Sequence, residues 1–173
     1  MKEKPNTSKT SVSKTNVCRL LERGNVPYTL VESDDVHDED WSSIQTSQSL
    51  GVEAGRIFKT LVLRGDKNRF LVCCVPSDSE LDMKKVARAS GDKRVEMIHV
   101  KELRDITGYV RGGCSPIGMK KPFPTFFDET LILYDTIFVN AGAINLAVEV
   151  DPNRLIEFLS AKAADLTVSP KVP

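Results

Sequence analysis

Apolar residues change their spacing several times along the chain, and each change predicts a different element. Between Ser13 and Gly24 they recur every three or four positions, which predicts a helix capped by the serine and ended by a left-handed glycine. An alternating run at residues 26–30 predicts a short strand, and residues 44–50 predict a weaker helix that closes at Gly51. The first part of the chain therefore indicates a helix, a strand and a helix.

The middle of the chain contains two β-rich runs, residues 57–64 and 69–75, joined by a Gly-Asp-Lys-Asn turn. A polar turn of this kind between two apolar runs predicts a hairpin. A helix should follow, capped by Ser79 or Asp82 and with Met83 on its buried side.

The second half of the chain contains short elements separated by turns, and it ends on a strong helix signal in which Asp151 precedes Pro152. Because several strands are joined by short turns, we expect a mixed α/β domain with a mostly antiparallel sheet. The expected strands are residues 95–98, 125–127, 131–133, 136–140 and 145–150, and a short helix is expected at residues 100–106.

Size and composition favour one globular domain. The chain has 173 residues, of which 40% are hydrophobic, so residues 14–167 can bury a real core, while polar residues 1–13 predict a disordered tail. The tail lacks the apolar stretch of a secretory signal, and no run approaches the roughly 20 apolar residues of a membrane span. We therefore expect a cytoplasmic protein that does not bind membranes and whose cysteines are reduced.

Charge and cysteine spacing exclude other classes of partner. The formal net charge is zero, so no overall field draws the protein to DNA, and RNA binding would need a local basic patch. The four cysteines form no C-x-x-C pair and neither histidine lies at zinc-ligand spacing, so no metal and no cofactor are expected. The basic residues that could form a patch are Lys84, Lys85, Arg88, Lys93, Arg94, Lys120 and Lys121.

The segment from Gly108 to Gly118 contains four glycines and one proline. Such a loop can present backbone N–H groups in a concavity suited to a carbonyl, a carboxylate or a phosphate, although a tight structural turn has the same composition. Cys114 and Ser115 are potential nucleophiles in this loop, but neither lies in a G-x-S-x-G elbow or near a histidine. Lys59 is a second candidate, because a lysine inside a buried strand either extends to solvent or meets an anion.

Taken together, these segments resemble the YbaK/EbsC family of aminoacyl-tRNA deacylases, which includes the editing domain of bacterial prolyl-tRNA synthetases. The order and spacing of the motifs match from about residue 17 to residue 165. The matching motifs are residues 58–61 (FKTL), 81–87 (LDMKKVA), 93–97 (KRVEM), 107–109 (TGY), 112–118 (GGCSPIG) and 120–121 (KK).

The resemblance implies a barrel-like α/β editing domain that hydrolyses the ester of a mischarged tRNA, typically Cys-tRNA(Pro), with prolyl-tRNA synthetase as a possible partner. It assigns catalysis to Lys59, Gly113 and Ser115, with Lys59 orienting the substrate and the loop amides stabilising the oxyanion. Water or the substrate thiol attacks, so no protein nucleophile is required. The implied substrate-binding residues are Phe58, Thr60, Gly112, Cys114, Pro116, Gly118, Asn140 and Gly142.

One segment departs from the family pattern of a Ser-Gly-Gly-Lys-Arg-Gly turn followed by Leu-Asp-Ile-Glu. Here Asn140 replaces the serine, Ala143 and Ile144 replace the basic pair, and Ala147 replaces the acid, while a tyrosine expected near Ser33 is missing. Two hypotheses follow: an editing hydrolase, or a diverged non-catalytic module that binds tRNA or a nucleotide.

Overall fold

The computed structural model describes residues 13–33 and 43–169, so the expectations for residues 1–12, 34–42 and 170–173 lie outside the described residues. The helices are α1 (Asn16–Arg23), α2 (Ser43–Leu50), α3 (Met83–Ser90), α4 (Leu103–Thr107) and α5 (Pro152–Leu159), with 3-10 turns η1 (Ala54–Arg56), η2 (Val100–Glu102) and η3 (Glu129–Leu133). The strands are β1 (Tyr28–Glu32), β2 (Phe58–Gly65), β3 (Leu71–Pro76), β4 (Val95–Met97), β5 (Thr125–Asp128), β6 (Ile137–Asn140), β7 (Leu146–Val150) and β8 (Lys162–Ala164).

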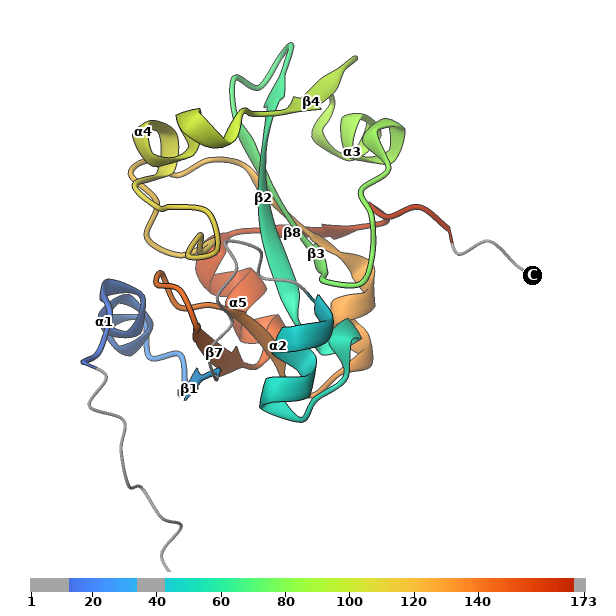
Figure 1. Ribbon diagram of the computed structural model, residues 1–173. Coiled ribbons are helices and arrows are strands. Elements are labelled where there is room, and N and C mark those ends of the chain that lie inside the picture. Colours follow the sequence, from blue (N-terminus) through green and yellow to red (C-terminus); the bar gives the residue numbers. More distant parts are fainter. Residues whose placement is uncertain (1–12, 34–42, 170–173) are drawn as a thin grey trace, which may run out of the picture.

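The strands form two sheets, with orders β1-β7-β6 and β4-β2-β3-β5-β8. The β3–β5 and β5–β8 pairs are parallel, and the other strand pairs are antiparallel. A parallel bridge between Ile57 and Phe138 joins the sheets beside the long central strand β2 (Figure 1). The mixed, mostly antiparallel α/β fold is therefore confirmed, although the sheets do not close into a barrel.

The core is divided by β2 and β3 into separate apolar clusters. On one face Phe58, Val62 and Cys74 pack into the main cluster, and on the other Leu63 and Cys73 pack into a second cluster that includes the buried residues of α3. Adjacent cysteines on opposite faces follow from the two-residue period of a strand. Both thiols are fully buried core groups.

The ends of α1 differ from the prediction. Thr15, not Ser13, caps the helix, because its hydroxyl accepts a hydrogen bond from the Cys18 amide. Gly24 has a φ of −82°, and the left-handed residue is Asn25, at 55°. A Cβ at Gly24 would lie 2.4 Å from the Phe158 ring, so the glycine is needed for the close packing of α5.

Three further expectations are corrected. Residues 131–133, expected as a strand, form part of η3, where a hydrogen bond from the Thr130 amide to the Asp128 carboxylate starts a turn. Met83 is 38% exposed, because Val86 and Ala87 take the buried side of α3. The polar strand β8 was not expected, since its pairing with β5 involves residues distant in the sequence.

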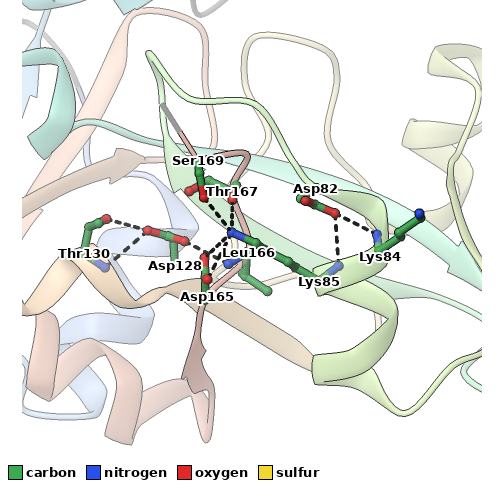
Figure 2. A network of polar contacts seen from close by, with 9 residues as sticks. All are labelled: Asp82, Lys84, Lys85, Asp128, Thr130, Asp165, Leu166, Thr167 and Ser169. Carbon is green, nitrogen blue, oxygen red and sulfur yellow. Dashed lines mark hydrogen bonds and ion pairs between the residues drawn. The ribbon is translucent and has the colours of Figure 1, made fainter. Parts of the chain in front are cut away.

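The segment after β8 is held against α3 by polar contacts (Figure 2). The Lys85 ammonium donates to the Thr167 carbonyl at 2.7 Å and lies 3.1 Å from the Asp165 carboxylate. The buried Asp128 carboxylate accepts from the Leu166 amide at 3.0 Å. These contacts fix residues 165–169, which in turn donate and accept backbone hydrogen bonds with the residues just before α3.

No helix within the described segments is long and apolar enough to span a bilayer.

Candidate functional site

Lys59 lies on the face of β2 that is opposite the main core. Phe58 packs into that core and Ile57 into a smaller outer cluster, so the alternation of the strand places Lys59 on the outer side with Ile57 and Leu61. The Lys59 side chain is half-buried, and its ammonium donates to the Ser77 carbonyl at 3.5 Å. The strand lysine therefore neither enters the core nor lies fully in solvent.

Asn140 lies on the same outer face as Lys59. In β6, Val139 belongs to the main core, whereas Phe138 packs with Ile57 in the outer cluster. Because the Ile57–Phe138 bridge is parallel, Lys59 and Asn140 each follow it by two residues on neighbouring strands. The fold thus places two candidate residues, 81 positions apart in the sequence, on one side of the sheet junction.

The Asn140 side chain connects the glycine loop to the β6–β7 turn. Its Nδ2 donates to the Gly112 carbonyl at 2.9 Å and to the Ala143 carbonyl at 3.2 Å, and its Oδ1 accepts from the Gly142 amide at 2.6 Å. Gly112 and Gly142 both have positive φ, of 81° and 91°. A Cβ at Gly113 would lie 3.3 Å from the Ile144 nitrogen, so the two backbones are in close contact there.

The amide pattern of the loop differs from the expected row of bare donors. The Gly113 amide donates to the Val110 carbonyl at 3.0 Å, so it is already used within a turn. Within the described residues, the amides of Gly112, Cys114 and Ser115 have no acceptor. The Gly113 N–H can therefore donate to a substrate only if this turn opens. The neighbouring amides can donate to a substrate without any such change.

Several other candidates have side chains that face the protein interior. Phe58 is fully buried beside Phe127, and the fully buried Ser115 hydroxyl accepts from the Ile117 amide at 3.2 Å. The Thr60 hydroxyl contacts the Cys74 sulfur at 3.8 Å. Phe58 and Ser115 can therefore contact a substrate only through their backbone atoms.

The remaining loop residues shape the turn. Burial raises the pKa of the Cys114 thiol to about 12, which leaves little thiolate at neutral pH. Pro116 is buried, and Gly118 is exposed with a φ of 78°. Within the part of the chain that the structure describes, no group of three or more Cys, His, Asp or Glu side chains could hold a metal ion.

Sequence reasoning did not identify the surroundings of Lys59. Burial lowers the pKa of its ammonium, and the carboxylates of Glu80 and Asp78 act in the opposite direction. These acids lie in the segment after β3, where the Ser77 amide donates to the Ile57 carbonyl and the Ser77 hydroxyl to the Ala54 carbonyl. This segment therefore lies against the FKTL motif in the folded chain. No spacing in the sequence predicts that contact.

Tyr109 is a second residue whose place the sequence did not reveal. Its hydroxyl donates to the Ile117 carbonyl within the loop. A Cβ at Gly118 or Gly142 would lie 3.0 Å or 3.1 Å from the Tyr109 side chain, so the tyrosine packs between the loop and the β6–β7 turn. Burial raises the pKa of Tyr109 to about 12, so it stays a neutral hydrogen-bond donor.

Comparison with known proteins gives the same family as the sequence motifs. Residues 39–158 match the model of the aminoacyl-tRNA editing domain. A protein of Enterococcus faecalis named "Putative Cys-tRNA(Pro)/Cys-tRNA(Cys) deacylase EbsC" is 45% identical over 160 residues, which cover 92% of this chain and 96% of that protein. The proline–tRNA ligase of Brachyspira hyodysenteriae is 25% identical over 122 residues, 70% of this chain but 21% of the ligase.

A solved structure supports the same relationship. The crystal structure of "a putative trans-editing enzyme for prolyl tRNA synthetase" has a TM-score of 0.77 and 26% sequence identity, and the match covers 91% of this chain and 100% of that one. The family model spans more than half of the chain and includes β2, the glycine loop and the β6–β7 turn. This chain therefore belongs to the family of aminoacyl-tRNA editing domains.

Proposed function

We propose that this protein is an aminoacyl-tRNA deacylase that hydrolyses mischarged tRNA, with Cys-tRNA(Pro) as its main substrate. The observation that carries the proposal is the placement of Lys59 and Asn140 on one face, with the Asn140 amide holding the glycine loop beside them. The 45% identity to a protein named as a Cys-tRNA(Pro) and Cys-tRNA(Cys) deacylase supports this substrate.

In the proposed reaction, the tRNA 3′ end binds on the outer face with the ester carbonyl next to the glycine loop. Lys59 orients the substrate and offsets the negative charge that develops on the carbonyl oxygen. The amides of Gly112, Cys114 and Ser115, which have no acceptor within the described residues, are the loop donors available for this oxygen. Gly142 borders the site, whereas the Thr60 side chain lies on the opposite face of β2 beside Cys74 and can contribute only through its backbone. Pro116, Gly118 and the Ser115 hydroxyl keep the loop in shape.

The nucleophile is water or the thiol of the cysteinyl group. Water attacks the ester carbon, the ester bond to the ribose oxygen breaks, and the water proton passes to that oxygen, giving free cysteine and tRNA. Attack by the substrate thiol forms a bond from sulfur to the ester carbon and breaks the same bond to the ribose oxygen, which takes the thiol proton, giving a thiolactone and tRNA. Product analysis by mass spectrometry distinguishes the two routes.

The test is a deacylation assay with Cys-tRNA(Pro), Ala-tRNA(Pro), Pro-tRNA(Pro) and Cys-tRNA(Cys). We expect turnover that falls by about 100-fold in Lys59→Ala and is partly retained in Lys59→Arg, because one electrostatic contact at the reacting carbonyl is worth roughly that factor. Arg154→Ala, an exposed change on α5, is the matched control. If every charged tRNA decays at the uncatalysed rate while binding persists, the protein is a binding module and the proposal is wrong.

The function also suggests a partner and a location. Because a segment of proline–tRNA ligase matches this chain, we propose that the protein acts with prolyl-tRNA synthetase in the cytoplasm. Co-purification of the two proteins from cells would support this partner, and separate elution at micromolar concentration would count against it.

A further inference from the structure

Two segments that pack together carry a local excess of positive charge. Residues 64–70 and 100–124 carry eight Lys or Arg against three Asp or Glu, although the whole chain has a net charge of zero. The Arg64 guanidinium lies 2.9 Å from the Glu102 carboxylate, and the Phe70 and Phe123 rings meet edge to face at 5.8 Å. In Figure 1 the β2–β3 turn and α4 lie at the same end of the molecule.

Two arginines share one aromatic ring in this region. The guanidinium groups of Arg64 and Arg69 each lie 5.5 Å from the centroid of the Phe70 ring. Phe70 is only partly buried and Arg69 is exposed, so neither the ring nor the second cation is enclosed by the core. Planar guanidinium groups and exposed rings are the groups on which unpaired bases stack.

Two lysines extend this region towards the glycine loop. Lys120 and Lys121 are exposed and follow the loop directly in the sequence. The Lys120 side chain lies over Gly108, where a Cβ would be 3.4 Å from its Cγ, and its ammonium donates to the Asp105 carbonyl. We call the combined surface the basic–aromatic face and define it as Arg64, Arg69, Phe70, Lys120, Lys121 and Phe123.

We propose that the basic–aromatic face binds the acceptor end of tRNA, adjacent to the nucleotide that carries the amino acid. This inference rests on the proposed function. Lys59 and Arg64 are five residues apart on β2, about 17 Å along the strand, and this odd separation places their side chains on opposite faces of β2. The glycine loop connects the two regions, because Asn140 holds its Gly112 end beside Lys59 and Lys120 and Lys121 directly follow it. A few unpaired nucleotides that follow this loop span the distance, so a 3′ end placed at Lys59 brings the next phosphates and bases to the basic–aromatic face. The cations meet the phosphates, and the guanidinium plane of the exposed Arg69 beside Phe70 accepts a stacked base.

The test compares two double variants that each remove two exposed cations. Arg69→Ala with Lys121→Ala alters the face, and Lys84→Ala with Arg154→Ala removes equal charge from α3 and α5. We expect the face variant to raise the Kd for uncharged tRNA(Pro) and the KM for Cys-tRNA(Pro) by about tenfold, with the single-turnover rate at saturating protein within twofold of wild type. The slope of log Kd against log salt should fall by about one to two.

The outcomes separate this inference from the proposed function. Uncharged tRNA has no ester, so its binding is measured whether or not the protein is a hydrolase. Equal Kd values for the two double variants overturn the inference even if Lys59→Ala abolishes turnover. A face variant that binds tRNA normally but loses affinity for prolyl-tRNA synthetase also overturns it, and identifies the face as a protein contact.

Discussion

Asn140 is the most informative residue to substitute, because its side chain connects the glycine loop to the β6–β7 turn through the hydrogen bonds described above. Asn140 is 4% exposed and makes three hydrogen bonds to backbone groups of Gly112, Gly142 and Ala143. Substitution by alanine removes all three and leaves the Gly142 N–H and the Gly112 carbonyl without these partners, whereas the Ala143 carbonyl keeps its bond from the Leu146 amide. Each lost bond costs about 0.5–1.5 kcal/mol, so Asn140→Ala should lower the free energy of unfolding by about 2–4 kcal/mol.

Two further variants divide this effect into its parts. In Asn140→Ser the hydroxyl can accept from the Gly142 amide and donate to one carbonyl, so about half of the loss should be recovered. In Asn140→Asp the carboxylate still accepts from Gly142, but it cannot donate, and it faces the Gly112 and Ala143 carbonyls. We therefore expect aspartate to be at least as destabilising as alanine at neutral pH, and less so in acid, where the protonated group can donate.

Urea unfolding gives the stability, and deacylation of Cys-tRNA(Pro) gives the activity. A loosened loop should reduce kcat/KM by about 10- to 100-fold in Asn140→Ala, because small displacements of positioning groups are costly. Val86→Ala, a fully buried change on α3, is the control for a similar stability loss away from the site. If Asn140→Ala and Val86→Ala retain the same activity, Asn140 does not position the loop and the reasoning fails.

Three other predictions concern stability and the nucleophile. Burial alone would raise the pKa of Asp92, but hydrogen bonds from Asn68, Ser90 and the hairpin backbone lower it from 3.8 to about 2. The stability that ionised Asp92 contributes is therefore complete above about pH 4 and is lost as the pH falls to 2. Asp92→Asn should remove this acid sensitivity, measured as the difference in the free energy of unfolding between urea titrations at pH 7 and pH 3. An unchanged pH dependence in the variant would contradict the prediction. Gly24→Ala should lower Tm by several degrees, because the new Cβ would lie 2.4 Å from the Phe158 ring; an unaltered Tm would mean that α5 moves away freely. Cys114→Ala should keep turnover within about threefold, because a thiol whose pKa is about 12 is not a nucleophile at neutral pH, and loss of all turnover would assign it that role.

Local signals in the sequence were sufficient for elements that are fixed by their own residues. Asp82 and Asp151 each cap the helix that they precede, because the carboxylate accepts from amides two and three residues later. The hairpin of β2 and β3 follows from its turn in the same way. Where two polar residues compete, as Ser13 and Thr15 do before α1, the choice depends on a contact with Cys18 that composition does not specify.

Features that depend on distant pairing could not be predicted. The Lys162–Ala164 strand has no strand-forming composition and exists because it pairs with Phe126–Asp128. The candidate site residues were predicted from their motifs, but their arrangement depends on the Ile57–Phe138 bridge, which no local pattern signals. For the same reason, the use of the Gly113 amide and the carboxylates near Lys59 became visible only in the folded chain.

The attachment of the segment after β8 affects how this protein should be handled in experiments. The Val168 amide donates to the Glu80 carbonyl and Thr167 bridges Leu81, next to the residues that surround Lys59. A fusion partner or a surface linkage placed directly after Ser169 would pull on this contact and disturb the lysine. Tethering through an exposed position on α5, such as Asn153, avoids that strain and is the better choice for binding measurements on a sensor chip.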